Sequence, residues 1–233
     1  MAKIKKTKSE SGEKNIIAVE EALGKSERFI EKNQNTIVWV ITIVVLIVGG
    51  YIGYNRFIIE PRDKEAASEM FVAERYFEQN EFRLALEGDG ANLGFLDIID
   101  SYRMTQSANL ARYYAGISFL MLGDYDEAID YLENFRKRDQ VIGSMAFGAI
   151  GDAHLELGDE TQAISYYKRA ANHKPDRLTA PMFLFKAAQL KEASGNYNGA
   201  IDLYTKIKKE YHGTHEANEI DYYIGRVNGR LNQ

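Results

Sequence analysis

Three stretches of the chain align with one another without gaps, and this repetition constrains the fold more than any other feature. They read LGDYDEAIDYL at 122–132, LGDETQAISYY at 157–167 and SGNYNGAIDLY at 194–204. Their glycines, Gly123, Gly158 and Gly195, are 35 and 37 residues apart. A period of this length predicts a stack of similar units, each too small to bury its apolar face alone.

The spacing within each stretch predicts two helices joined by a tight turn. The glycine reverses the chain at a helix end, where a left-handed conformation is common. Small residues recur seven positions before and five positions after each glycine, where the two helices would cross: Gly116, Gly151, Ala188, Ala128, Ala163 and Ala200. A large residue follows four positions later, and we expect it to fill the space between neighbouring helices: Leu132, Tyr167 and Tyr204.

This pattern resembles that of the tetratricopeptide repeat family, which has a period of about 34 residues. The chain departs from the family pattern at its first position, where Arg112, Phe147 and Leu184 stand in place of tryptophan. The third unit has Ile207 and His212 where alanine and proline are typical. The resemblance implies an all-α fold in which helix pairs stack into an α-solenoid.

The repeats divide the C-terminal part of the chain into units. We expect repeats at 106–140, 141–177 and 178–214, preceded by a degenerate repeat at 65–105. In that degenerate repeat, 65–79 and 94–102 are predicted helices, and GDGANLG at 88–94 is a predicted loop. The periodic apolar residues of 215–233 predict a capping helix that closes the stack.

A segment without Asp, Glu, Lys or Arg runs from Asn33 to Asn55. Within it, 36–54 reads TIVWVITIVVLIVGGYIGY, and nineteen helical residues cover about 28 Å, close to the hydrocarbon thickness of a bilayer. Trp39 near one end, and Tyr51 and Tyr54 near the other, suit the membrane interfaces. We therefore predict a single transmembrane helix at 36–54, the alternative being a buried core helix.

Gly49 and Gly53 form a G-x-x-x-G pair, which permits close approach of two helices in lipid. The sequence leaves two interpretations open, a homodimer through this pair and no dimer.

The residues that flank the anchor suggest its orientation. The tail 1–35 carries a net charge of +2, whereas residues 55–233 carry −7. This difference favours a cytoplasmic tail and an external repeat domain, joined to the anchor by a linker at 55–64. Within the tail, Ile16, Val19, Leu23 and Ile30 recur at helical spacing. This amphipathic stretch fits a helix on the membrane or a partner, and equally a solvated run-in to the anchor.

The whole layout is similar to that of the ancillary SecYEG translocon subunit family: a charged tail, one anchor, then a degenerate and three well-formed repeats. The stretch EALGKSERFIEKNQ before the anchor adds to this similarity. The resemblance implies a single-pass inner-membrane protein with an N-terminus in the cytoplasm and periplasmic repeats. It also implies protein partners, namely translocon subunits, a periplasmic chaperone or isomerase, and emerging polypeptides.

The sequence shows no pattern typical of an enzyme. There is no cysteine, and no nucleotide-binding, zinc-protease or serine-hydrolase motif occurs. His212 and His215 are three residues apart and have no evident third metal ligand other than Glu216. The net charge of −5 argues against a nucleic-acid partner. We therefore expect no catalytic residues, no cofactor and no metal.

What remains is a surface, because the first helix of each repeat lines the concave side of such a stack. Its exposed aromatic and apolar residues would suit a peptide or a helix. For each residue, packing against an adjacent helix is an equally good interpretation. By register, Gly148 also faces this side. The candidate partner-binding residues are Leu110, Tyr113, Ile117, Met145, Asp152, Met182, Phe185 and Gln189.

These features together predict a membrane-anchored interaction adaptor of the bacterial envelope that works beside the secretion translocon. Two alternatives remain at this stage. One is a scaffold for another envelope process, such as outer-membrane assembly or cell division. The other is an enzyme with an unrecognised site.

Overall fold

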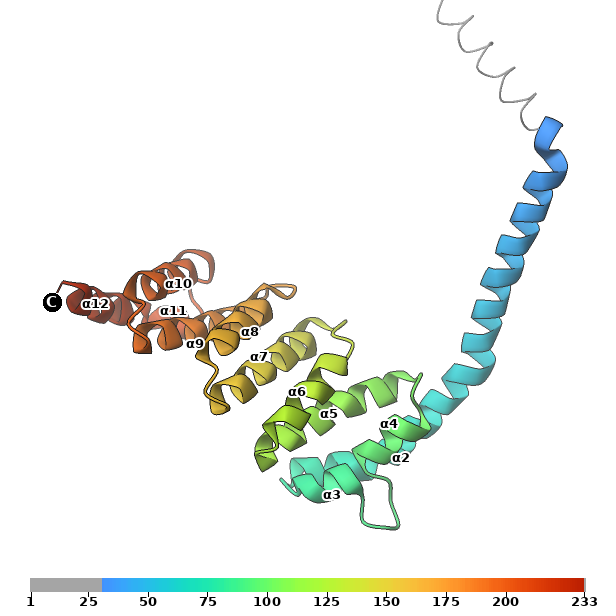
Figure 1. The fold of residues 1–233 in the computed structure, drawn as a ribbon, viewed down its shortest axis with the longest axis horizontal. Helices are drawn as coiled ribbons and strands as arrows, with labels where there is room; N and C mark the ends of the chain where they lie inside the picture. Colours follow the sequence, from blue (N-terminus) through green and yellow to red (C-terminus); the bar gives the residue numbers. More distant parts are fainter. Residues whose placement is uncertain (1–30, 233) are drawn as a thin grey trace, which may run out of the picture. The chain divides into compact units, whose positions relative to one another are not determined.

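The computed structural model describes residues 31–232, and every regular element in that range is helical. The chain divides into two units, Met1–Ile58 and Ile59–Gln233 (Figure 1). Most of the tail 1–35, with its amphipathic stretch, lies outside the described residues. Each unit is considered below by itself.

One apolar helix carries the predicted anchor. Helix Glu31–Glu78 has 48 residues. Its most apolar window of 18 residues has a mean hydropathy of 2.4, and no residue of that window is buried. Trp39 and Tyr51 are among its most exposed side chains. By length and composition, this N-terminal helix is able to cross a membrane.

The segment 55–64, which we expected to be a linker, is helical. Five residues form a π-helical turn, η1 (Asn55–Ile59), and helix α2 (Glu60–Glu78) follows directly. Pro61 lies in the first turn of α2, and it has no backbone N–H for the carbonyl four residues earlier. The π turn spans that carbonyl, which belongs to Phe57. A wider turn accommodates the proline without ending the helix.

The second unit is a stack of helix pairs (Figure 1). Its first pair consists of α2 against two short helices, α3 (Phe82–Glu87) and α4 (Phe95–Ser101). The next three pairs are α5 (Gln106–Leu122) with α6 (Tyr125–Asn134), α7 (Gln140–Glu156) with α8 (Glu160–Asn172), and α9 (Thr179–Ala193) with α10 (Tyr197–Glu210). The C-terminal helices are α11 (His215–Asn218) and α12 (Ile220–Leu231), and α12 packs against α10.

The turns within the pairs follow the predicted glycines. Gly123, Gly158 and Gly195 have φ values of 88°, 80° and 77°, in the left-handed region that glycine adopts without strain. The prediction of a glycine turn in each repeat is therefore confirmed.

Small residues lie where the two helices of a pair cross, also as predicted. A Cβ atom added to Gly116 would lie 2.5 Å from Leu132 Cγ, and one added to Gly151 would lie 2.7 Å from the ring of Tyr167. Ala128 and Ala163 are fully buried at the same crossings. In these two pairs, one large side chain covers a glycine of the partner helix, and the α9–α10 pair has the buried Ala188 at the equivalent position.

The first pair is irregular because a loop interrupts its second helix. Asp89 organises this loop by accepting hydrogen bonds from the backbone N–H groups of Ala91 and Asn92, at 2.9 and 2.7 Å. Leu86 before the loop and Phe95 after it are both buried in the same apolar cluster. The two short helices α3 and α4 therefore cover α2 as one interrupted helix would.

Candidate partner-binding surface

Three of the candidate residues meet in one pocket near the C-terminal end of the stack. Met182, Phe185 and Gln189 of α9 line a pocket of about 320 Å³. Its opposite wall comes from α11, α12 and the residue between them: His215, Glu216, Glu219 and Tyr223. The pocket therefore lies between the first helix of the last repeat and the C-terminal helices.

Aromatic rings form the apolar part of this pocket. The rings of Phe185 and Tyr223 meet edge to face, with centroids 4.8 Å apart. Both rings also contact Tyr204 of α10, at 5.7 and 5.6 Å, and Tyr204 is fully buried. The two rings that line the pocket are therefore held in place by a third, buried ring from α10.

The polar rim of the pocket carries charges of both signs. Lys186 lies on the α9 side, and Glu216 and Glu219 lie on the other. The Lys186 ammonium is 2.7 Å from the Asp152 carboxylate of α7. Tyr167 of α8 donates a second hydrogen bond to the same carboxylate oxygen, at 2.5 Å. Burial and the nearby Asp152 carboxylate raise the pKa of Tyr167, so its hydroxyl stays protonated.

Asp152 was itself a candidate partner-binding residue. Its half-buried carboxylate is occupied by Tyr167 and Lys186, so it links three helices and orients a lysine that lines the pocket. Its place in the structure is thus beside the pocket and not among the pocket's lining residues.

The three candidates on α5 are divided between a second pocket and the core. Leu110 lines a pocket of about 420 Å³ between the start of α5 and the α6–α7 loop. Tyr113 and Ile117 are half-buried and pack against the apolar cluster formed with α6, α7 and α8. Burial raises the pKa of the Tyr113 hydroxyl.

The two remaining positions on α7, the candidate Met145 and the concave-side Gly148, have opposite environments. Met145 is exposed. Gly148 is buried beneath the ring of Phe183 of α9, which leaves no room for a Cβ atom. Of the two interpretations, packing against an adjacent helix holds for Gly148, because contact with the next repeat covers this position.

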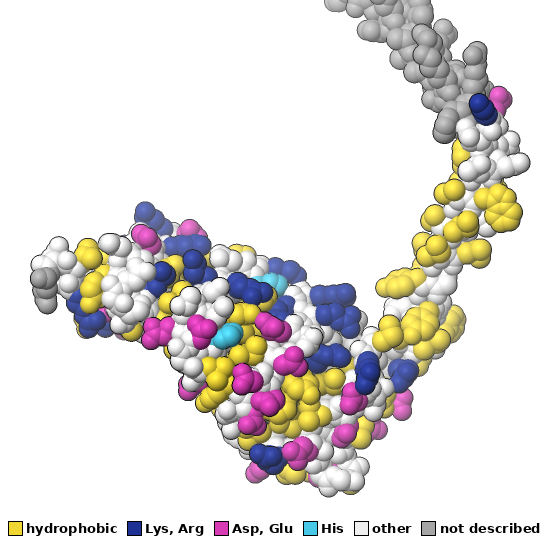
Figure 2. All heavy atoms as spheres, in the orientation of Figure 1, with side chains coloured by type: hydrophobic (Ala, Val, Ile, Leu, Met, Phe, Trp, Pro, Cys, Tyr) yellow, Lys and Arg dark blue, Asp and Glu magenta, His cyan; other side chains and the backbone are white. Residues whose placement is uncertain are grey.

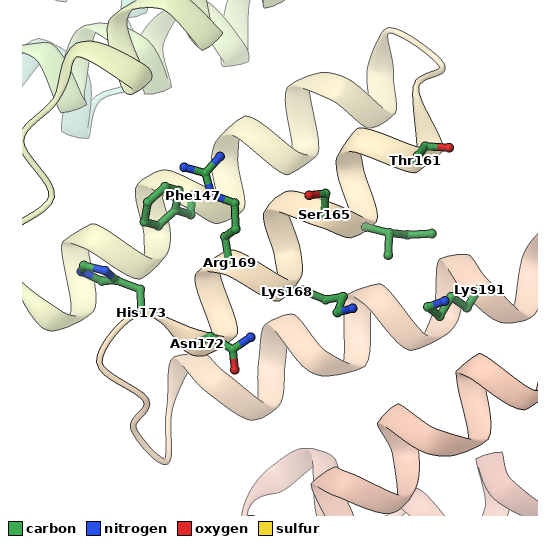
Figure 3. A pocket seen from close by; sticks show the side chains of 9 residues that line it. Phe147, Thr161, Ser165, Lys168, Arg169, Asn172, His173 and Lys191 are labelled. Atoms are coloured by element: carbon green, nitrogen blue, oxygen red, sulfur yellow. The ribbon is translucent and has the colours of Figure 1, made fainter.

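A third pocket, the largest of the three, runs along α8 and encloses about 630 Å³ (Figure 3). Phe147 of α7 and Lys191 of α9 lie at its two sides, with Ser165, Lys168 and Arg169 of α8 between them. The Arg169 guanidinium stacks over Phe147 and Tyr166, at 4.7 and 4.6 Å from the ring centroids. This pocket is open and basic, and it contains none of the candidate residues.

Sequence reasoning missed the contribution of the C-terminal helices to the first pocket. Tyr223 is one of several apolar residues in 215–233, and the sequence gives no direct sign that it meets Phe185. One signal was available at Glu192, which follows Leu184 and Ala188 at intervals of four and so occupies a core position of α9. A carboxylate there requires a buried partner.

The described residues 31–232 contain no group of three or more His, Cys, Asp or Glu that could hold a metal ion. The three pockets present aromatic, apolar and charged side chains over open surfaces, which suits binding to another protein chain.

Comparison with known families supports this interpretation. Two tetratricopeptide repeat models match the chain, one at 99–140 and 113–178 and the other at 183–212. A search of curated proteins gives no match. The matched ranges cover α5 to α8, α10 and all but the first turn of α9, the helices that form the three predicted repeats. The three helix pairs from α5 to α10 are therefore tetratricopeptide repeats, and one apolar helix lies N-terminal to them in the chain.

Proposed function

We propose that this protein is a membrane-anchored adaptor that binds a protein partner in the pocket between α9 and the α11–α12 end. Tetratricopeptide repeats mediate protein–protein interactions, and the single apolar helix supplies the means of attachment. The observation that carries the proposal is the pocket itself. It joins the rings of Phe185 and Tyr223 to a rim that contains Lys186, Glu216 and Glu219.

The pocket favours a particular kind of ligand. Met182, Phe185 and Tyr223 would surround an apolar side chain, which is the usual anchor of a peptide or helix in such a surface. Glu216 and Glu219 would attract a basic residue next to that anchor. A short segment with an apolar residue flanked by Lys or Arg fits both features.

We place this adaptor in the envelope of a bacterium, at the inner membrane beside the secretion translocon. The support is the layout of tail, anchor and repeats, which resembles the ancillary SecYEG subunit family. The net charges of +2 on residues 1–35 and −7 on residues 55–233 favour a cytoplasmic N-terminus and a periplasmic repeat domain. Partners would then be translocon subunits, a periplasmic chaperone or isomerase, or emerging polypeptides.

Site-specific photo-crosslinking tests the partner and the surface together. A photoreactive residue at Gln189, which is exposed in the pocket, should capture a partner in intact cells. The same residue at Gln162, exposed at the start of α8 and outside that pocket, is the matched control. Equal capture at both positions would contradict the pocket. Capture at Gln189 of an outer-membrane assembly or division complex, without translocon subunits, would contradict the proposed process.

Protease accessibility tests the orientation. In spheroplasts, an external protease should degrade residues 55–233 and leave a fragment that contains the anchor and tail. Protection of the repeat domain until the membrane is broken would overturn the periplasmic location and the secretion role.

The anchor also offers a surface for a second copy of this chain. Gly49 and Gly53 lie one helical turn apart and have open space around them, so nothing within their unit blocks close approach of another helix. We include a homodimer through these glycines in the proposal. A Gly49→Leu and Gly53→Leu double variant should lose the dimer in a membrane two-hybrid assay, whereas Gly50→Leu should keep it.

A further inference from the structure

The loops that connect successive repeats form one continuous edge of the second unit. Hydrogen bonds link each of these loops or helix starts to the next along the stack. Arg62 at the start of α2 donates to Ser101 O at 2.7 Å, and Arg136 N donates to Asn109 Oδ1 at 2.8 Å. Lys174 donates to Arg138 O, and Arg177 donates to His212 O. The edge therefore runs without interruption from α2 to the α10–α11 loop.

Basic residues gather on this edge. The segments between α4 and α5, α6 and α7, α8 and α9, and α10 and α11 contain six Lys or Arg and only two acidic residues. Lys137 turns inward, because its ammonium donates to the carbonyls of Leu132, Glu133 and Phe135. The other five are exposed, and we call them the basic edge: Arg103, Arg136, Arg138, Lys174 and Arg177.

The carboxylates on this edge do not neutralise it. Asp139 accepts a hydrogen bond from Ile142 N, and Asp176 accepts from Leu178 N and Thr179 N, so both cap helix starts. Within the described residues, Arg103 alone among the five is paired with a carboxylate, the exposed Asp100. Four cations thus remain available to an external anion.

The opposite edge has the opposite charge. The turns between α2 and α3, α5 and α6, and α7 and α8 contain Glu81, Asp124 and Asp159, and no Lys or Arg. Figure 2 shows dark blue side chains along the upper edge of the repeat unit and magenta ones toward its lower edge. Since residues 55–233 carry a net charge of −7, the basic edge is a local concentration against the average composition.

One end of this edge lies close in the chain to the predicted anchor. Only η1, five residues long, separates the predicted span 36–54 from α2. The first turn of α2 lies next to the loop that carries Arg103 of the basic edge, since Arg62 donates to Ser101 O and Asp63 accepts from Ser107 N at 2.8 Å. Five helical residues extend about 8 Å, so the chain itself keeps this end of the edge close to the bilayer surface.

We propose that the basic edge binds anionic lipid headgroups of the membrane that holds the anchor. Charge complementarity supports this ligand, because juxtamembrane clusters of Lys and Arg are attracted to anionic bilayers and the attraction acts only within a Debye length. Four available cations on two successive loops, with the paired Arg103 on the loop before them, match an extended array of phosphates better than a single compact anion. The proposal rests on the membrane anchor of the proposed function, and it is independent of which protein occupies the α9 pocket.

The chain has no cysteine, so one introduced cysteine gives a unique label in the full-length protein. Gln140→Cys places a fluorophore on the basic edge at the start of α7, and Gln162→Cys places it at the opposite edge at the start of α8. Both glutamines are exposed. The protein is reconstituted in nanodiscs that contain a trace of headgroup-labelled acceptor lipid, and energy transfer to that lipid is measured.

We expect stronger transfer from position 140 in discs of phosphatidylglycerol and phosphatidylcholine than in discs of phosphatidylcholine alone. In 1 M salt, where the Debye length is about 3 Å, the difference should disappear. Position 162 should give weaker transfer in both lipids. The Arg136→Glu and Arg138→Glu double variant should remove the effect of the anionic lipid. Arg75→Glu with Arg83→Glu, which changes the net charge equally beside the α2–α3 turn, should preserve it.

The outcomes separate this proposal from the anchor on which it depends. Failure of the chain to enter nanodiscs, seen by size-exclusion chromatography, would overturn the anchor and the basic-edge proposal together. Entry with equal transfer from position 140 in both lipids would overturn only the lipid-binding edge. Equal lipid effects in the two charge-reversal variants would also overturn it, because net charge would then be sufficient. Circular dichroism of each variant confirms that the helices are intact.

Discussion

Arg226 of α12 donates two hydrogen bonds to the carboxylate of Glu192 of α9, at 2.9 and 2.7 Å. Glu192 is only 5% exposed, and it also accepts a hydrogen bond from Tyr204 of α10 at 3.2 Å. The Arg230 guanidinium lies 3.3 Å from Glu192 Oε1, the oxygen that also accepts from Arg226 Nε. One carboxylate therefore ties together α9, α10 and α12, and two of these helices, α9 and α12, also line the aromatic pocket.

Removal of this carboxylate should loosen the C-terminal end. Glu192→Ala leaves Arg226 and the Tyr204 hydroxyl without their shared partner, and we expect a loss of about 3 kcal/mol in the stability of α12. Hydrogen exchange measured by mass spectrometry should show faster exchange in α12 and unchanged exchange in α5. Asp221→Ala breaks only the exposed Lys208–Asp221 pair and should leave α12 nearly unaffected. Similar exchange in both variants would show that Glu192 has no special role.

Two glycine substitutions should have opposite effects. Gly151→Ala puts a Cβ atom 2.7 Å from the Tyr167 ring, and overpacking of this kind costs about 1–3 kcal/mol. Gly225→Ala in α12 meets nothing within 4 Å, and alanine should stabilise the helix by about 0.5–1 kcal/mol. Thermal melts followed by circular dichroism compare the two. A stabilised Gly151→Ala variant would contradict the close crossing of α7 and α8.

Lys137 should titrate at unusually low pH. Burial beside Phe135 and Phe147 lowers the pKa of its ammonium to about 8, against the opposing effect of Glu133. NMR of reductively methylated protein should show one lysine that titrates near this value. The signal should be absent from Lys137→Arg, which also assigns it. A titration of Lys137 near 10.5 would show that the ammonium is solvated.

The same shift predicts a pH dependence of stability. The unfolded chain holds the Lys137 proton up to its ordinary pKa of 10.5, whereas the folded chain releases it near 8. Between these values the unfolded state binds more protons, so the free energy of unfolding should rise with pH. Lys137→Met should flatten this rise in urea titrations at about pH 7 to 9.5, below the range in which the tyrosines ionise.

Charged residues in the middle of the apolar helix should prevent anchoring. Val45 and Leu46 are 62% and 68% exposed within their unit, so lysine at these positions does not disturb any packing there. Each lysine at the centre of a span costs about 3 kcal/mol on insertion. The Val45→Lys and Leu46→Lys double variant should therefore be extracted from membranes by alkaline carbonate. The Val45→Leu and Leu46→Val exchange, which keeps the composition, should stay in the pellet. Retention of the lysine variant would argue against a spanning helix.

The features that sequence reasoning predicted correctly are contacts within one repeat. Gly116 against Leu132 and Gly151 against Tyr167 recur because the same short connection brings the same two positions together in each unit. The left-handed turns at Gly123 and Gly158 recur for the same reason. Periodicity alone is sufficient for such contacts, since they depend on helix geometry and a turn of two or three residues.

Contacts between repeats were harder to predict. Gly148 faces the concave side by register, and the structure buries it beneath Phe183 of the next unit. The cationic partner of Asp152 comes from Lys186, 34 residues later, and that of Glu192 comes from Arg226, also 34 residues later. Which side chains meet across this distance depends on how far each helix pair is rotated and shifted relative to the next one.

The sequence by itself determined the helical repeat, its glycine turns, its small-residue crossings and the apolar N-terminal helix, because each arises from residues close together in the chain. The tertiary structure decided which candidate residues share a pocket, which carboxylates are occupied by neighbours, and that the basic residues of separate loops form one edge. Those properties come from the stacking of units. They depend on small rotations and shifts between neighbouring helix pairs, which the sequence of a single repeat does not specify.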